Sequence, residues 1–175
     1  MNGVRGVSKG GARSLALGVA CAVGLVAGPS REVPPAGGTT CRTLLATVRV
    51  SWQPSAAATA AGVVARVRYP ASVDLPIDAT GSARSRVENR TGAAGGLFDA
   101  VAKDTDADGR RDLVSVGLVT TGIPPGDFAT IRFDCRTGAA PPAASEFSCE
   151  PDVAGSQASL PATCSVAIAP EAAGI

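Results

Sequence analysis

The chain has 175 residues, of which 45% are hydrophobic and only 3% aromatic, and it contains no histidine. This length fits one domain with a processing segment, and the lack of histidine excludes the commonest catalytic base, the commonest metal ligand and any Ser-His or Cys-His pair. The formal net charge of +1 becomes −2, from 13 basic and 15 acidic residues, once residues 1–28 are removed, and this mild balance argues against nucleic acid as a partner.

Residues 1–28 have the composition of a secretory signal peptide. A basic start is followed by the apolar stretch SLALGVACAVGLVA at 14–27 and then by small residues, which is the usual order in such segments. The apolar stretch is too short and too rich in glycine for a comfortable membrane span, and no other stretch could cross a bilayer. We therefore predict an exported protein, either secreted or held at the cell surface.

The cysteines point to the same compartment. Cys21 lies inside the signal segment; alternatively, as the last residue of GVAC at 18–21, it becomes a lipidated N-terminus, although Gly18 stands where leucine is usual. An even number of remaining cysteines in an exported domain predicts two disulfides, whereas no CxxC pair or histidine is present to complete a usual zinc site. These cysteines are Cys41, Cys135, Cys149 and Cys164.

Beyond a Pro- and Gly-rich flexible leader at 29–40, the sequence predicts β-strands. Apolar and polar residues alternate in LLATVRVSW, VVARVRY and FATIRFDC, a pattern typical of strands with one face on a core and one in water. Gly- and Pro-rich turn signals such as ATGS, TGAAGG and RTGAAPPA separate the segments. Further strands are expected at 73–77, 97–103, 112–119, 146–152 and 162–168.

Many short strands without a convincing amphipathic helix predict an all-β fold, an antiparallel β-sandwich over residues 41–170 with a tail at 171–175. On the predicted strands, Trp52 and Tyr69 fall on the apolar face, which favours core packing over a sugar-stacking platform. Four arginines fall on outward faces and form the candidate binding face. They are Arg49, Arg66, Arg68 and Arg132.

The strand pattern also suggests how the cysteines pair. Strands 146–152 and 162–168 are joined by a loop centred near residue 156, so an antiparallel hairpin would place Cys149 opposite Cys164. Cys41 begins the first strand and Cys135 ends an inward-facing row. We favour these two pairs, each contributing about 2–4 kcal/mol of stability, with a Cys41–Cys164 pairing as the open alternative.

The stretch KDTDADGRRD is the candidate metal site. Asp104, Asp106 and Asp108 occupy alternate positions, and carboxylates so spaced in a loop can converge on one calcium ion, which takes about six to eight oxygen ligands. The Arg110 carbonyl and the Asp112 carboxylate would be further ligands. The position where an EF-hand carries its bidentate glutamate holds a serine instead, and the flanks alternate as strands, so the stretch is not an EF-hand.

The alternative is an ordinary hairpin turn. Asp-Gly between alternating hydrophobic residues is a leading hairpin signal, so Asp108 and Gly109 alone would supply the turn. The other aspartates would then only keep an exposed loop soluble, and Lys103, Arg110 and Arg111 would neutralise them without a metal.

The order of the predicted elements carries a family resemblance. The segments that carry it are, in chain order, VRVSW, VVARVRYPASVDLP, LFDAVAKDTDADGRRDLVSVGLV and GIPPGDFATIRFDC, followed by a closing pair, FSC and TCSV. Over roughly residues 43–168 this order resembles the cohesin-like domains of the bacterial carbohydrate-binding-domain superfamily. The resemblance implies a jelly-roll of about nine strands that has no catalysis of its own and binds a protein module or a polysaccharide.

The sequence thus predicts an exported, non-enzymatic binding or adhesion module for a protein partner or a polysaccharide, with the acidic stretch as the candidate site of a structural calcium ion. An exported structural or envelope protein without a specific ligand is the alternative. A glycoside hydrolase is a third reading, because such enzymes use a pair of carboxylates. Nothing in the spacing singles out two of the candidates, which are Asp74, Asp78, Asp99, Glu146 and Glu150.

Overall fold

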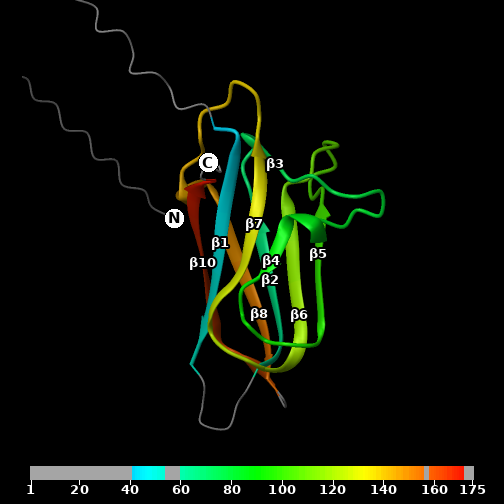
Figure 1. The fold of residues 1–175 in the computed structure, drawn as a ribbon, viewed down its shortest axis with the longest axis vertical. Coiled ribbons are helices and arrows are strands. Elements are labelled where there is room, and N and C mark those ends of the chain that lie inside the picture. The colour runs from blue at the N-terminus through cyan, green and yellow to red at the C-terminus, as the bar shows by residue number, and fades with distance from the viewer. Residues whose placement is uncertain (1–40, 54–59, 156–157, 172–175) are drawn as a thin grey trace, which may run out of the picture. The chain divides into compact units, whose positions relative to one another are not determined.

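Two antiparallel sheets packed face to face make up the described part of the chain (Figure 1). The computed structural model describes residues 41–53, 60–155 and 158–171. The predicted signal peptide with Cys21, the leader at 29–40 and most of the tail lie outside these residues. Within them the prediction of an all-β, antiparallel sandwich with two disulfides is confirmed.

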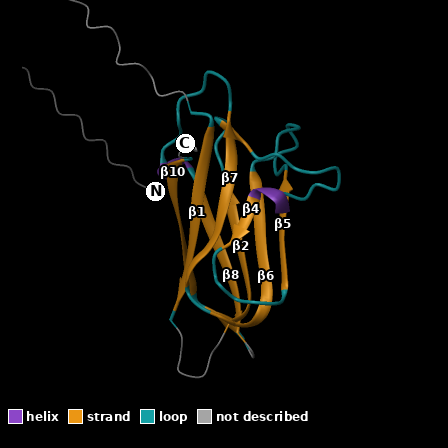
Figure 2. Cartoon of the chain, viewed as in Figure 1, coloured by secondary structure: helices purple, strands orange, loops and turns teal. Residues whose placement is uncertain are grey.

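Each sheet has five strands in the described residues. Sheet A has the order β10-β1-β7-β3, with β4 also paired to β7; its strands are β1 (Thr43–Trp52), β3 (Val73–Asp74), β4 (Val87–Asn89), β7 (Gly126–Cys135) and β10 (Ala162–Pro170). Sheet B has the order β5-β6-β2-β8-β9; its strands are β2 (Ala60–Arg68), β5 (Leu97–Lys103), β6 (Leu113–Ile123), β8 (Ser148–Gly155) and β9 (Ser159–Leu160). Short 3-10 turns at Arg84–Arg86 and Ala144–Glu146 complete the structure (Figure 2).

The core lies between the sheets and is built from the inward rows that the alternation predicts. On β1 every second residue from Leu44 to Trp52 is buried, and on β7 Phe133 is fully buried. Trp52 and Tyr69 are 7% and 4% exposed, so core packing is confirmed for both. Most core residues are valine or alanine. Three of the aromatic rings pack together, with the Phe133 centroid 4.9 Å from that of Tyr69 and 5.7 Å from that of Phe147, and Phe98 and Phe128 form a separate pair.

Several strand boundaries differ from the prediction. β3 ends at Asp74 rather than at residue 77, because Pro76 has no N–H to donate to a ladder. The 3-10 turn at Ala144–Glu146 occupies the predicted start of β8. The short strands β4 and β9 carry too few residues for a visible alternation and were not predicted.

Both favoured disulfides are present, but one has a different structural setting from the one predicted. Cys41 and Cys135 tie the start of β1 to the end of its neighbour β7, with Cα atoms 5.6 Å apart. Cys149 and Cys164 are also linked, with Cα atoms 5.5 Å apart, yet their strands do not form a hairpin ladder: β8 pairs with β2 and β9, and β10 pairs with β1. This disulfide therefore joins sheet B to sheet A.

Candidate functional site

The acidic stretch forms the loop between β5 and β6. The ladder of these strands ends at the pair Lys103 and Leu113, beyond which the Asp112 amide donates a hydrogen bond of 3.0 Å to the Lys103 carbonyl. The whole of residues 104–112 is therefore loop, wider than the two-residue turn that Asp108 and Gly109 alone would make. Left-handed backbone at Ala107 (φ 61°) and Gly109 (φ 86°) folds it back on itself.

Three predicted ligands come together in this loop. One oxygen each of Asp104, Asp106 and Asp108 lies within 4.8 Å of the other two, and all three side chains are exposed. The loop backbone positions them. Asp104 accepts hydrogen bonds of 2.8 Å from the amides of Ala107 and Gly109, and Asp108 accepts one of 2.7 Å from the Arg110 amide. A carboxylate oxygen that accepts one N–H keeps a second lone pair, so these bonds leave ligand capacity for a cation.

Desolvation, backbone hydrogen bonds and like charges push the pKa values of the cluster apart. Desolvation opposes ionisation of Asp104, but the N–H groups of Gly109 and Ala107 more than offset it, and the pKa of Asp104 is lowered. At Asp106 the Asp108 amide favours the carboxylate, yet desolvation and the negative charge of Asp108 outweigh it, and its pKa is raised. A divalent cation at this point would favour the ionised form of all three side chains.

The Asp112 side chain, a further predicted ligand, is engaged elsewhere, and so is the side chain of Arg110, whose carbonyl was the ligand predicted at that position. The Asp112 carboxylate accepts hydrogen bonds from the side-chain hydroxyl and the backbone amide of Thr105. It also accepts one of 3.1 Å from the Arg68 guanidinium. Its pKa is lowered, first by the Thr105 hydroxyl. The Arg110 guanidinium donates a hydrogen bond of 3.2 Å to the Tyr69 carbonyl, and its carbon lies 5.8 Å from the centroid of the Tyr69 ring.

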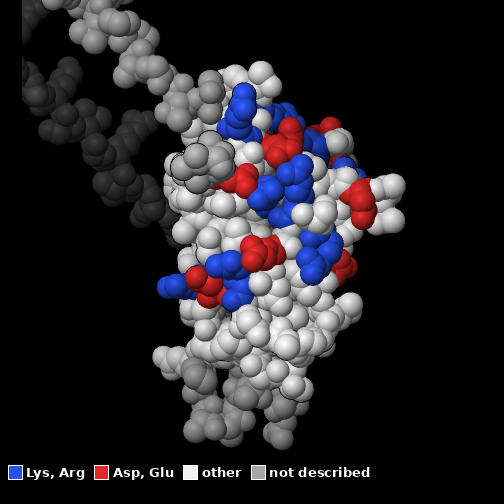
Figure 3. Space-filling view, in the orientation of Figure 1, with Lys and Arg blue, Asp and Glu red and all other residues white. Residues whose placement is uncertain are grey.

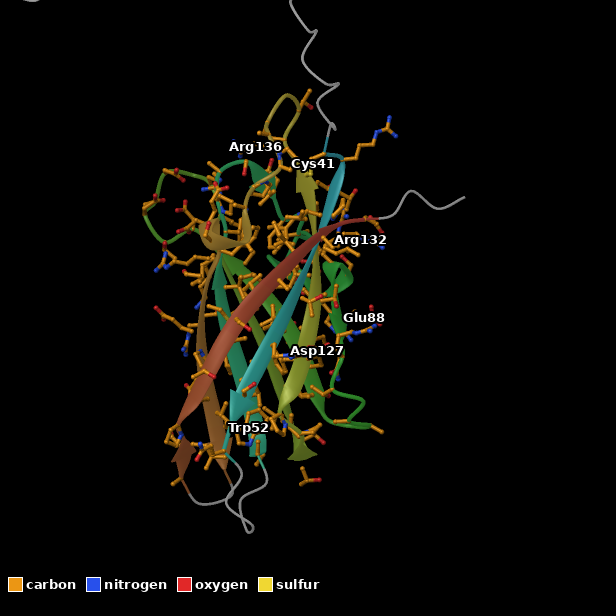
Figure 4. The ribbon with its side chains drawn as sticks, turned by 90° about the vertical axis from the view of Figure 1, so that its left-hand side faces the viewer. Cys41, Trp52, Glu88, Asp127, Arg132 and Arg136 are labelled. Carbon is orange, nitrogen blue, oxygen red and sulfur yellow. A yellow bond between two sulfur atoms is a disulfide. The ribbon has the colours of Figure 1, made fainter. Side chains whose placement is uncertain are left out.

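The four candidate binding-face arginines do not form one face. Arg49 and Arg132 lie on β1 and β7 of sheet A, whereas Arg66 and Arg68 lie on β2 of sheet B. In Figure 4, where β10, β1 and β7 face the viewer, Arg132 and Asp127 are labelled on the outer side of sheet A. The sandwich therefore divides these arginines between its two opposite outer faces.

Each of these arginines has an acidic partner. Arg49 contacts Asp127 at 2.9 Å, and Arg68 contacts Asp112 at 3.1 Å. Arg66 pairs with Asp152 on the neighbouring strand β8, and Arg132 pairs with Glu171, which directly follows β10. Figure 3 shows the same interleaving of basic and acidic side chains on the visible face. Outward parity predicted that the arginines are exposed, but parity within one strand carries no information about partners on another.

Three of the five carboxylates considered for glycoside hydrolysis are engaged separately. Asp74 forms two hydrogen bonds with the Arg136 guanidinium, of 2.9 and 2.8 Å. Asp78 accepts the amides of Thr80 and Ser82 in its own turn, and Glu146 accepts the Ala143 amide. These contacts are those of turn caps and ion pairs, which is the structural role of such residues.

Comparison of the chain with models of known protein families, with curated proteins and with solved structures finds no match. Within the part of the chain that the structure describes, no helix has the length and apolar character needed to cross a membrane. The two disulfides fit an oxidising compartment.

Proposed function

We propose that the chain is an exported, non-enzymatic binding module whose acidic loop at residues 104–112 holds a structural calcium ion. The observation that carries this proposal is the convergence of Asp104, Asp106 and Asp108 within 4.8 Å at the tip of a hairpin. The frame behind the loop is a sandwich held by two disulfides, which supports a preorganised surface. The resemblance to cohesin-like domains supports the same class of function.

The partner of this module is a protein or a charged polysaccharide. Every aromatic side chain of the chain is buried or half-buried, so no exposed ring offers a platform for stacking on neutral sugars. The outer faces instead carry interleaved arginine and carboxylate side chains, such as Arg49 with Asp127. Polar contacts of this kind give orientation and specificity at protein interfaces.

Calcium binding is tested by thermal unfolding of the purified, disulfide-bonded protein in chelator and in millimolar calcium. A ligand that binds only the folded state raises the unfolding midpoint by mass action, by about 2.7 kcal/mol at a hundredfold excess over Kd. We expect a rise of several degrees in the wild type and none in the Asp104→Asn, Asp106→Asn variant. Coincident curves for the wild type with and without calcium would contradict the proposal.

A matched control separates ligation from a general effect of charge. Asp152 is an exposed carboxylate on β8 that lies 3.7 Å from Arg66, away from the loop. The Glu150→Gln, Asp152→Asn variant, at two exposed positions of β8, removes the same two negative charges and is expected to keep the full calcium shift. Partner searches, by co-sedimentation with acidic polysaccharides and by binding of secreted proteins, are then run in both calcium and chelator.

A further inference from the structure

Strand β10 forms one edge of sheet A, where it pairs with β1 alone among the described strands (Figure 1). Its sequence is ATCSVAIAP, which contains no charged residue and has a proline only at its last position. Natural edge strands are usually short, charged, interrupted by proline or covered, because their unpaired N–H and C=O groups otherwise pair with another chain. β10 is long, uncharged and uninterrupted.

The other edges of the two sheets each carry one of these protections. β3 and β9 have two residues each, and β4 has three. The part of β8 that β9 leaves uncovered contains two acidic residues and a proline. β5 carries Asp99 and Lys103, and its backbone is already partly paired, since the Ala83 amide donates a hydrogen bond of 2.8 Å to the Ala100 carbonyl. In the described part of the chain, β10 therefore stands apart from the other edge strands.

The ladder with β1 determines which backbone groups of β10 are free. The Glu171 amide donates a hydrogen bond of 3.1 Å to the Thr43 carbonyl, and in an antiparallel ladder alternate residues direct both N–H and C=O toward the partner strand. The Cys135 amide bonds to the Arg42 carbonyl on the other side of β1, which agrees with this parity. Every second residue from Glu171 back to Thr163 therefore bonds to β1. The residues between them direct their N–H and C=O groups to the open side, and no hydrogen bond reaches these groups within the described residues; they include Cys164, Val166 and Ile168.

The side chains of the same residues are only partly covered. Cys164, Val166 and Ile168 point to the core and are partly buried, whereas Val48 and Val50, in the inward row of the neighbouring β1, are 0% and 1% exposed. An added strand would extend the cover over the inward row of β10. On the outer face this strand would meet only small, exposed side chains, which are those of Thr163, Ser165, Ala167 and Ala169.

We propose that β10 pairs antiparallel with β10 of a second copy of this chain, about a two-fold axis at Val166. This register places Val166 opposite itself and Cys164 opposite Ile168, so each free N–H meets a free C=O of the other copy. Because β10 has no charged side chain, the pairing brings no like charges together along the strand. The two copies of sheet A become one continuous sheet.

A second copy fits this edge better than the segment that precedes Cys41. Residues 29–40 contain three prolines, Pro29, Pro34 and Pro35, which have no N–H to donate to a ladder. β10 itself supplies an uncharged strand with the matching parity of free groups. The pairing does not involve the acidic loop, so it is tested in chelator and stands or falls apart from calcium binding.

The test combines sedimentation equilibrium of the disulfide-bonded protein with hydrogen exchange of its backbone amides at low and high concentration. We expect a monomer–dimer equilibrium in which the amides of Val166 and Ile168 become protected as the dimer forms. The amides of Ser165 and Ala167, which already bond to β1, should be protected at both concentrations. A protein that stays monomeric at about 1 mM would leave the edge to a strand of another protein and would overturn the proposal. A dimer without new protection at Val166 and Ile168 would use another surface and would overturn it as well.

Charge variants test the two-fold axis. In the proposed register the two Ala167 residues are diagonal neighbours across the axis, so Ala167→Lys or Ala167→Glu should weaken the dimer by about fivefold through like charges. An equal mixture of the two variants should recover it, because opposite charges then meet. Ala167 is exposed, so neither change should alter the unfolding midpoint of the monomer. Thr121→Lys, at an exposed position of β6 in sheet B, adds the same charge and should dimerise like the wild type. Equal association of the wild type and both Ala167 variants would overturn the proposal.

Discussion

Gly96, immediately before β5, has a backbone that only glycine adopts without strain. Its φ is +105°, and a Cβ there would lie 2.6 Å from the Thr120 Cβ and would also clash with the Val119 carbonyl. Gly92, in the same turn, has a φ of +69° but open space around the position of a Cβ. A side chain at Gly92 would therefore meet backbone strain alone, whereas one at Gly96 would meet both backbone strain and steric overlap.

Changing Gly96 to alanine should destabilise the protein more than changing Gly92. We expect Gly92→Ala to lower the free energy of unfolding by about 1 kcal/mol, the cost of left-handed backbone. Gly96→Ala should lower it by about 3 kcal/mol, because β6 backbone must also shift. Urea unfolding of the two variants measures the difference, and equal losses would show that the chain relieves the overlap at no cost.

At the scale of elements, β8, β9 and β10 show how a hairpin can be divided between two sheets. β8 and β9 start an ordinary antiparallel ladder, with Val153 opposite Leu160. Pro161 follows, and it has no N–H to continue a ladder. The chain then enters sheet A as β10, yet Cys149 and Cys164 stay near enough to bond. The inferred hairpin centre was therefore right for the disulfide and wrong for the strand pairing.

The two disulfides should contribute unequally to stability. In the chain-entropy account, a cross-link stabilises by restricting the unfolded chain, more so for a longer loop. Cys149 and Cys164 are 15 residues apart, and Cys41 and Cys135 are 94 apart. Replacing the first pair by alanine should cost about 3 kcal/mol and replacing the second about 4–5 kcal/mol. Chemical unfolding of both double variants tests this, and a larger loss for the shorter loop would contradict the entropic account.

At the scale of the whole molecule, carboxylates in turns link stability to pH. Side-chain and backbone hydrogen bonds from Thr80 and Ser82 lower the pKa of Asp78, the Thr105 hydroxyl lowers that of Asp112, and loop amides lower that of Asp104 against desolvation. A lowered pKa in the folded state contributes stability that is present above the unfolded pKa and is lost as the pH falls through the folded value. Asp106, whose pKa is raised, acts in the opposite direction.

The protein in chelator should therefore lose stability as the pH falls below about 4, the ordinary pKa of aspartate. Urea midpoints measured between pH 7 and pH 2 should show this decline. The Asp78→Asn, Asp112→Asn variant, which keeps an acceptor but cannot titrate, should show a flatter dependence. A wild-type midpoint that stays constant down to pH 2 would mean that these bonds persist in the unfolded chain.

The sequence by itself determined the features that depend on near neighbours. Alternation with a period of two identified most strands and placed Trp52 and Tyr69 in the core, because successive side chains of a strand point to opposite faces. The spacing of the aspartates likewise predicted that three of them gather in one loop. The even cysteine count, the loop centre near residue 156 and the inward row that ends at Cys135 led to the favoured disulfide pairs, which the structure contains.

The tertiary structure alone decided which sheet each strand joins and which distant groups meet. The four arginines have the same outward parity, yet they lie on opposite sheets and each has an acidic partner, such as Asp127 for Arg49. A polar pocket at one end of the sandwich is lined by Tyr69, Arg110 and Arg136, which are far apart in the chain. Such contacts depend on how strands are ordered across a sandwich, and the local pattern of one strand contains no record of that order.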